Sequence, residues 1–226
     1  MCGRFTLTTS GAVLARAFDL DAAPVLAPRF NVAPGQDVAT IWQTPEGRRE
    51  LRLRRWGLVP HWARDAKIGS RLINARAETA AEKPAFRSAL RQRRCLVAAD
   101  GFYEWSARGR EAGDRQPYHL ALPGREPFGI AGLYEQWRGA DGALLETCVL
   151  LTVGPNDQVR PLHDRMPAIL RHEDHAGWLD PSERDARRVQ ALLVPWTGPA
   201  LEVRAVSRRV NRPANDDPAC IEPLQA

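Results

Sequence analysis

The chain has 226 residues, of which 44% are hydrophobic, and it carries a net charge of +5 at pH 7 with a pI near 9.4. Its length suffices for one large domain or two small ones, and no apolar run reaches the roughly 18 residues needed to span a membrane. The N-terminus lacks the basic and then apolar pattern of a signal peptide, so we expect a cytoplasmic, nucleoid-associated protein.

The basic residues are almost all arginines, with Lys67 and Lys83 as the lysines. Guanidinium groups hydrogen-bond to phosphate oxygens and stack on bases, so this composition favours a nucleic-acid partner. A genome-wide codon bias explains the preference for arginine over lysine, but it does not explain the net positive charge.

Hydrophobic periodicity and turn residues predict the following elements in chain order. They are a helix over 10–20, strands over 37–43 and 50–56, a helix over 83–91, strands over 94–100, 101–105, 118–122, 128–137 and 146–153, a helix over 180–194 and a strand over 201–206. Ser10 and Asp180 stand where helix caps are expected, and Leu51 and Leu53 alternate on the strand over 50–56.

Strands joined by short loops, with helices at the periphery, indicate an α+β fold. We expect one domain over residues 1–226, with a mainly antiparallel sheet curled toward a barrel and an irregular tail over 207–226. A bulge or sharp turn is expected at Gly101, between two apolar strands.

The four cysteines are widely spaced, and Cys95 and Cys148 lie in predicted strands, so we interpret these two as core residues. His172 and His175 lack the spacing of a zinc helix and are interpreted as a solvated first turn. This spacing gives no reason to predict a metal site. No phosphate-binding glycine loop and no Gly-x-Ser-x-Gly elbow occurs, so we do not predict a nucleotide cofactor either.

Cys2 directly follows Met1, and removal of Met1 would leave an amine and a thiol on adjacent carbons. Such a pair condenses with an aldehyde to a Schiff base, and the thiol then closes a five-membered thiazolidine ring. Both groups have ordinary pKa values of about 8, so both nucleophiles exist near neutral pH. The alternative is that Cys2 is an ordinary second residue at a frayed terminus.

Three polar residues stand in apolar or turn-like surroundings: Asn74, Glu104 and His163. A buried glutamate has a raised pKa and can act as a general acid, and histidine is a second proton carrier. Asparagine can both donate to and accept from an amine or a sugar hydroxyl. Each also has a structural interpretation, as an ion-pair partner, a loop anchor or a turn cap.

Aromatic and basic residues interleave near Trp56 and Trp62, a pattern typical of single-stranded DNA binding. One or both tryptophans could instead belong to the core. Arg4 and Arg76 each lie two residues beyond Cys2 and Asn74.

These segments together resemble the SOS response-associated peptidase (SRAP) family, whose members process abasic sites. The resemblance rests on residues 1–5 (MCGRF), 30–34 (FNVAP), 56–60 (WGLVP), 73–79 (INARAET), 95–105 (CLVAADGFYEW) and 163–167 (HDRMP), with parts of 206–216.

The resemblance implies that Cys2, freed of Met1, captures the C1′ aldehyde of an abasic site in single-stranded DNA as a thiazolidine crosslink. It implies that Asn74 positions the amine and the sugar, and that Glu104 and His163 transfer protons. The phosphate clamps would be Arg4, Arg76 and Arg165, and Trp56 and Trp62 would stack on bases.

Two alternatives remain open. The first is a thiol peptidase that acts on other proteins, with Cys2, His163 and Asn74 as its catalytic set. The second is a DNA-binding protein that makes no covalent bond. We expect a monomer, and the sequence leaves open whether Met1 is removed by self-cleavage or by an aminopeptidase.

Overall fold

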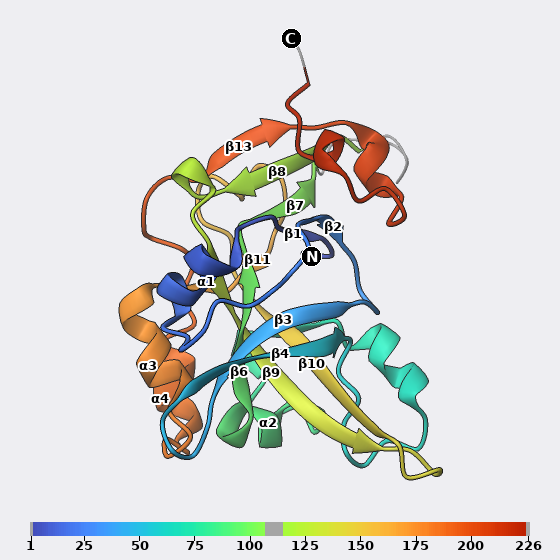
Figure 1. Cartoon of the computed structure of the whole chain (residues 1–226), viewed down its shortest axis with the longest axis vertical. Coiled ribbons are helices and arrows are strands. Elements are labelled where there is room, and N and C mark those ends of the chain that lie inside the picture. Colours follow the sequence, from blue (N-terminus) through green and yellow to red (C-terminus); the bar gives the residue numbers. More distant parts are fainter. Residues whose placement is uncertain (1, 107–114, 225–226) are drawn as a thin grey trace.

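The computed structural model describes residues 2–106 and 115–224, and its strands form a barrel and a second sheet stacked above it (Figure 1). The strands are β1 (Phe5–Leu7), β2 (Arg29–Val32), β3 (Asp37–Gln43), β4 (Arg49–Trp56), β5 (Asn74–Arg76), β6 (Arg94–Ala99), β7 (Gly101–Trp105), β8 (Pro117–Ala121), β9 (Phe128–Arg138), β10 (Leu144–Val153), β11 (Met166–Pro167), β12 (Ile169–Leu170) and β13 (Glu202–Ala205).

The barrel has the strand order β10-β4-β3-β6-β9, and the pairing of β9 with β10 closes it. Its pairs are antiparallel except β10 with β4, and β5 extends the sheet parallel to β10. The predicted α+β fold with a curled, mainly antiparallel sheet is therefore confirmed.

The second sheet has the order β13-β8-β7-β1-β2 and is antiparallel throughout. The chain leaves the barrel at the corner between β6 and β7, at Asp100 and Gly101. A side chain on Gly101 would place its Cβ 2.2 Å from Nε2 of His119, so only glycine fits this turn. The Asp100 carboxylate fixes the corner by accepting hydrogen bonds from Thr6, Thr8 and Thr9.

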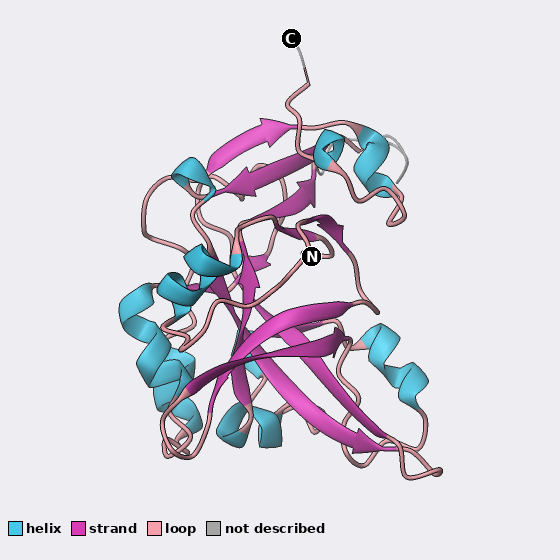
Figure 2. Cartoon of the chain, in the orientation of Figure 1, coloured by secondary structure: helices cyan, strands magenta, loops and turns pink. Residues whose placement is uncertain are grey.

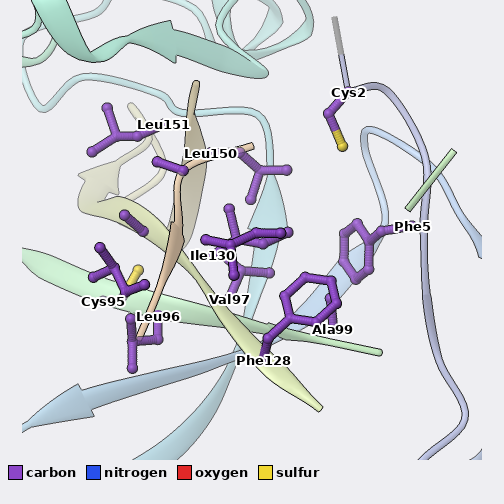
Figure 3. Close-up of a cluster of buried hydrophobic side chains, with 14 of the residues drawn as sticks. Cys2, Phe5, Cys95, Leu96, Val97, Ala99, Phe128, Ile130, Leu150 and Leu151 are labelled. Carbon is purple, nitrogen blue, oxygen red and sulfur yellow. The ribbon is translucent and has the colours of Figure 1, made fainter. Parts of the chain in front are cut away.

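The two sheets share one hydrophobic core. Phe5 and Phe102 of the second sheet belong to the same buried cluster as Ile130 and Leu150 of the barrel. Figure 3 shows Cys2 at the edge of this cluster, on the side of Phe5. Cys95 and Cys148 are fully buried within it, which confirms their interpretation as core residues.

The helices lie outside the sheets (Figure 2). They are α1 (Gly11–Phe18), α2 (Arg87–Gln92), α3 (His175–Leu179) and α4 (Ala186–Ala191), with 3₁₀ turns η1 (Ala66–Arg71), η2 (Ala77–Thr79), η4 (Pro123–Arg125), η5 (His172–Asp174), η6 (Arg208–Asn211) and η7 (Pro218–Cys220). Ser10 occupies the N-cap position of α1, as predicted, but its hydroxyl makes no capping hydrogen bond. Among the described residues, no helix is long and apolar enough to cross a bilayer.

The predicted helix over 180–194 is wrong. Asp180 instead ends α3, and its carboxylate accepts from the backbone and hydroxyl of Ser182, which turns the chain. A new helix, α4, starts only after Asp185, which caps it by accepting from the Arg187 N–H. The first of the two aspartates makes a turn and the second makes a cap, which the sequence alone does not distinguish.

The interpretation of His175 as a solvated residue is also wrong. His172 is exposed, but His175 is 3% exposed and stacks on Phe18, with ring centroids 5.7 Å apart. The packing of α1 against α3 therefore removes this histidine from solvent.

The alternation expected on β4 holds at Leu51, which is partly buried against the core, but fails at Leu53. Leu53 is 54% exposed, whereas Arg54 is buried. The Arg54 guanidinium lies over Tyr134, 4.1 Å from the ring centroid, and Nη1 donates to Oγ1 of Thr40 at 2.5 Å. The face of an aromatic ring offsets the cost of burying the cation.

Candidate active site at the N-terminus

Cys2 lies directly before β1 and is fully buried. Its thiol makes a long contact of 3.7 Å to the carbonyl of Arg4. Burial raises the pKa of this thiol far above its ordinary value, and the negative charge of Glu104 raises it further. The sulfur is therefore a neutral thiol at pH 7.

Asn74 is the first residue of β5 and pairs with Leu150 of β10. Its side-chain amide donates to the Cys2 carbonyl at 2.8 Å. Its Oδ1 is buried and has no hydrogen-bond partner within residues 2–106 and 115–224. One end of the side chain thus holds the cysteine, while the other is an acceptor available to a ligand.

Glu104 is 1% exposed and lies on β7, next to the start of the chain. The β1–β7 register pairs Phe5 with Phe102, and the Tyr103 N–H donates to the Arg4 carbonyl at 3.0 Å. Continuing this register places Glu104 opposite Gly3. Burial, together with the charge of Asp164, raises the pKa of Glu104 to about 7. The carboxyl group can therefore both donate and accept a proton near neutral pH.

His163 lies in the loop before β11 and is partly buried. Its Nδ1 accepts the backbone N–H of Arg165 at 3.0 Å and also lies 2.9 Å from a carboxylate oxygen of Asp164. The first contact needs a lone pair on Nδ1 and the second needs a proton there. Burial lowers the pKa of His163, which favours the neutral ring, and the hydrogen bond that Nδ1 accepts from the Arg165 N–H assigns the proton of that ring to Nε2.

The structure brings the four predicted residues to one region from β5, β7 and two loop segments. Asn74 contacts Cys2 directly, and the charge of Glu104 acts on the Cys2 thiol. The charge of Asp164 acts on Glu104, which places the His163 loop on the same side. Among the described residues, no group of three His, Cys, Asp or Glu side chains is arranged to hold a metal ion.

A buried cysteine near the chain start, whose carbonyl accepts a hydrogen bond from Asn74 and whose thiol feels the charge of Glu104, agrees with the motifs seen in the sequence. The family model described as SOS response associated peptidase (SRAP) matches residues 1–213. The chain belongs to the SRAP family.

Relatives in this family align along nearly the whole chain. The abasic site processing protein YoqW of Bacillus subtilis (strain 168) is 41% identical over 225 residues, which covers 98% of this chain and 99% of the relative. The abasic site processing protein HMCES of Gallus gallus is 32% identical, and the alignment covers 89% of this chain and 63% of the relative.

Solved structures share the SRAP fold. A crystal structure of a protein from Bacteroides thetaiotaomicron aligns with a TM-score of 0.85 and 25% identity, over 99% of this chain and 100% of the other. A second, from Bordetella bronchiseptica, has a TM-score of 0.77 and 27% identity, over 91% of this chain and 100% of the other.

The two tryptophans that were expected to stack on bases, Trp56 and Trp62, differ in accessibility. Trp56 is 1% exposed, with its ring centroid 5.3 Å from that of Phe5, and its indole N–H donates to the Ile73 carbonyl at 2.8 Å. This burial corrects the expectation that Trp56 presents a stacking face to DNA. The ring instead links β1 to the residue before Asn74. Trp62 is 52% exposed and keeps an accessible ring.

The three predicted phosphate clamps also differ. Arg76 is exposed. The Arg4 guanidinium donates to the Asn31 side chain at 2.8 Å and to the Val210 carbonyl at 2.5 Å. Arg165 donates to the carboxylate of Glu78. In this conformation, two of the three arginines therefore use their guanidinium groups within the fold.

Sequence reasoning gave no role to Asn31, Glu78 or Asn211, although each hydrogen-bonds to an arginine near the site. A signal was present for Asn31, a polar residue between Phe30 and Val32 in a segment that carries the family resemblance. Glu78 and Asn211 also lie in segments that carry the resemblance, but their contacts span 87 and 207 positions in the chain, so no local pattern could indicate their partners.

Proposed function

We propose that this chain processes abasic sites in single-stranded DNA by forming a covalent crosslink through Cys2 after removal of Met1. The observation that carries the proposal is the arrangement around Cys2. Asn74 holds its carbonyl at 2.8 Å, and Glu104, with a pKa of about 7, lies beside it. The names of the relatives, abasic site processing proteins, support the choice of substrate.

The reaction begins at the amine. The Cys2 nitrogen attacks the C1′ aldehyde of the open abasic sugar, and the carbinolamine loses water to give an imine. The thiol then adds to the imine carbon, and its proton moves to nitrogen as the five-membered ring closes. One water is lost overall. A neutral thiol suits this order of steps, because the S–H proton is the one that the ring nitrogen receives.

Glu104 supplies the proton that turns the carbinolamine hydroxyl into water and accepts a proton from the attacking amine. A carboxyl group with a pKa near 7 serves both steps at neutral pH. Ring closure has a protective consequence. An imine left open permits β-elimination and strand scission, and addition of sulfur consumes that imine.

Asn74 and His163 position the sugar. The Oδ1 of Asn74 accepts a hydrogen bond from the amine or from a sugar hydroxyl, since no side chain or backbone group among the described residues occupies it. The Nε2–H of neutral His163 donates to the sugar oxygen. The same group returns a proton when the crosslink reverses.

DNA follows the exposed basic and aromatic residues near this region. Arg76 is exposed two residues beyond Asn74, and Arg115 is exposed where its charge acts on His163. A hollow of about 400 Å³ beside Trp62 is lined by Arg64, Lys67 and Arg71, among others. Phosphates bind the cations, and a base stacks on the indole of Trp62. One copy of the chain suffices for this arrangement.

The peptidase alternative needs a thiolate nucleophile, and burial opposes formation of a thiolate at Cys2. The proposal does require that Met1 leaves, because the nitrogen of Cys2 is otherwise an amide. Either self-cleavage or an aminopeptidase meets this requirement.

The test is incubation with an oligonucleotide that carries one abasic site, followed by a denaturing gel. We expect a heat-stable shifted band, which is absent with Cys2→Ala and with an oligonucleotide whose tetrahydrofuran analogue lacks the aldehyde. Cys2→Ser keeps the amine but not the thiol, so its band should require borohydride reduction. Mass spectrometry should show the sum of the two masses less one water.

Other results would favour other functions. Casein cleavage without a DNA band would indicate a peptidase. Binding that high salt abolishes, with no covalent band, would indicate a non-covalent DNA-binding protein. Active protein that retains Met1 would contradict the proposal directly.

A further inference from the structure

The C-terminal segment 207–220 packs against the end of the second sheet, beside the chain start (Figure 1). Its two 3₁₀ turns, η6 and η7, bring Val210 to Tyr103 in a small cluster separate from the main core. The segment is therefore folded and packs against the second sheet.

Asn31 fixes this segment to β2. It is fully buried, and its side-chain amide nitrogen lies within hydrogen-bond distance of three tail carbonyls: Val210 at 3.1 Å, Arg212 at 3.1 Å and Asn215 at 2.7 Å. Its Oδ1 accepts from Arg4 at 2.8 Å. One side chain thus joins the tail to β2 and to Arg4, which lies two residues beyond Cys2.

Asn211 contacts the neighbours of both reactive residues. Its carbonyl accepts from Nη2 of Arg4 at 3.3 Å, and Arg4 is two residues from Cys2. Its side-chain Oδ1 accepts the indole N–H of Trp105 at 2.8 Å, and Trp105 follows Glu104. Arg4 also donates to the adjacent Val210 carbonyl at 2.5 Å.

These contacts lie where the β1–β7 ladder ends. The last rung of this pair is the hydrogen bond from Tyr103 N–H to the Arg4 carbonyl. Cys2 and Glu104 lie just beyond it, and the ends of paired strands fray unless other groups hold them. Asn211 contacts the side chain of Arg4, just before β1, and that of Trp105, the last residue of β7, and so holds this end of the ladder together.

We propose that Asn211 is a positioning residue of the Cys2 site, which acts through Arg4 and Trp105 to set the distance between Cys2 and Glu104. The inference rests on the proposed function. A displacement of about 1 Å between a nucleophile and its proton carrier can lower a rate by about 10²-fold, so a modest change at the tail affects the chemistry. DNA binding, which depends on exposed cations, is affected little.

The side chain of Asn211 is exposed, so its removal leaves the core intact. The variants are Asn211→Ala, which removes the acceptor for Trp105, and Asn211→Asp, which keeps it. Asn215→Ala is the matched control, because among the described residues that side chain donates to the Arg209 carbonyl of the same tail and to no other group, and its own carbonyl remains for Asn31.

The crosslinking rate is measured at saturating abasic DNA, together with the DNA concentration for half-maximal rate and the melting temperature. For Asn211→Ala we expect a fall of about tenfold in the maximal rate, with the half-saturating concentration and the melting temperature nearly unchanged. Asn211→Asp should recover most of the rate, and Asn215→Ala should match the wild type.

The outcomes separate the two proposals. A wild-type chain that forms no covalent band overturns the proposed function, and this inference with it. If Asn211→Ala crosslinks at the same rate as the wild type, the inference about Asn211 is wrong and the proposed function stands. Equal losses in Asn211→Ala and Asn215→Ala, accompanied by lower melting temperatures, would show that the tail only supports the fold.

Discussion

Arg165 and Glu78 form a two-pronged ion pair, with Nη1 2.7 Å from one carboxylate oxygen and Nη2 2.9 Å from the other. The same guanidinium donates to the Thr152 carbonyl at 2.5 Å, and the backbone N–H of Arg165 donates to His163. Glu78 lies just beyond β5, which carries Asn74. The pair therefore connects the loop of His163 to the strand of Asn74.

The first prediction concerns this pair. Lysine cannot contact both carboxylate oxygens in the planar geometry of arginine, so Arg165→Lys should lower the free energy of unfolding. The Glu78 side chain is 54% exposed, so solvent screening limits the loss to about 1 kcal/mol. Hydrogen bonding to Arg165 lowers the pKa of Glu78, so the contribution is present above the ordinary value of 4.5 and is lost as the pH falls.

Chemical denaturation at pH 7 and pH 3 measures this effect, with Glu78→Gln and the double variant completing a cycle. Additive losses in the double variant would show that the two side chains do not stabilise one another.

The second prediction concerns the pH dependence of crosslinking. The free amine of Cys2 becomes more abundant as the pH rises, whereas the protonated form of Glu104 is lost above about 7. The rate should therefore follow a bell-shaped curve near neutral pH. Glu104→Gln should lower the rate strongly and remove the alkaline limb, while salt-sensitive DNA binding remains. Equal loss of binding and rate would refute the proton-transfer role.

Glu104 should also affect stability. Its pKa is raised in the folded state, so its contribution is full below 4.5 and is lost as the pH rises through about 7. At pH 8 the buried charge then destabilises the fold by up to about 3 kcal/mol, and Glu104→Gln should melt at a higher temperature than the wild type. Identical melting curves from pH 4 to pH 8 would show that the carboxyl group is not desolvated.

The fourth prediction concerns Asn74. Aspartate has nearly the same shape, but it cannot donate to the Cys2 carbonyl and adds a negative charge beside Cys2. Asn74→Asp should lower the crosslinking rate by about 10²-fold, because the cysteine is no longer held in place. Single-turnover kinetics measure the rate, and Asn215→Asp controls for the added charge. A rate within twofold of the wild type would remove Asn74 from the mechanism.

The fifth prediction compares the two tryptophans. Trp62→Ala should weaken binding of single-stranded DNA by about 1–3 kcal/mol without changing the melting temperature, since its ring is exposed. Trp56→Phe should instead lower stability by about 1–3 kcal/mol, because the Ile73 carbonyl loses one of its two donors, keeping the Leu150 N–H, and the smaller ring leaves a cavity in the core. Fluorescence anisotropy and thermal unfolding measure the two effects. Weaker binding by Trp56→Phe at unchanged stability would restore a DNA role for that residue.

Local patterns predicted β3, β4, β6 to β10 and β13, because alternation and apolar runs depend on neighbouring residues, but they did not predict the short strands β1, β2, β5, β11 and β12. The hairpin of β3 and β4, the buried strand β6 and the turn at Gly101 all occur where expected. The same local patterns failed where one residue type can have two structural roles. Asp180 forms a turn and Asp185 forms a cap, and the longer helix predicted there is absent.

Sequence alone determined the chemical inventory of this protein: a cysteine placed to become the first residue, an asparagine, a glutamate and a histidine in apolar settings, and the motifs of the SRAP family. Tertiary structure decided which of these groups meet and which remain accessible. Trp56 and Trp62 lie six positions apart at the two ends of one Gly- and Pro-containing segment, yet one is buried and the other exposed. Arg4 and Arg165 find partners 27 and 87 positions away. Exposure and pairing arise from contacts between distant segments, and no local pattern records them.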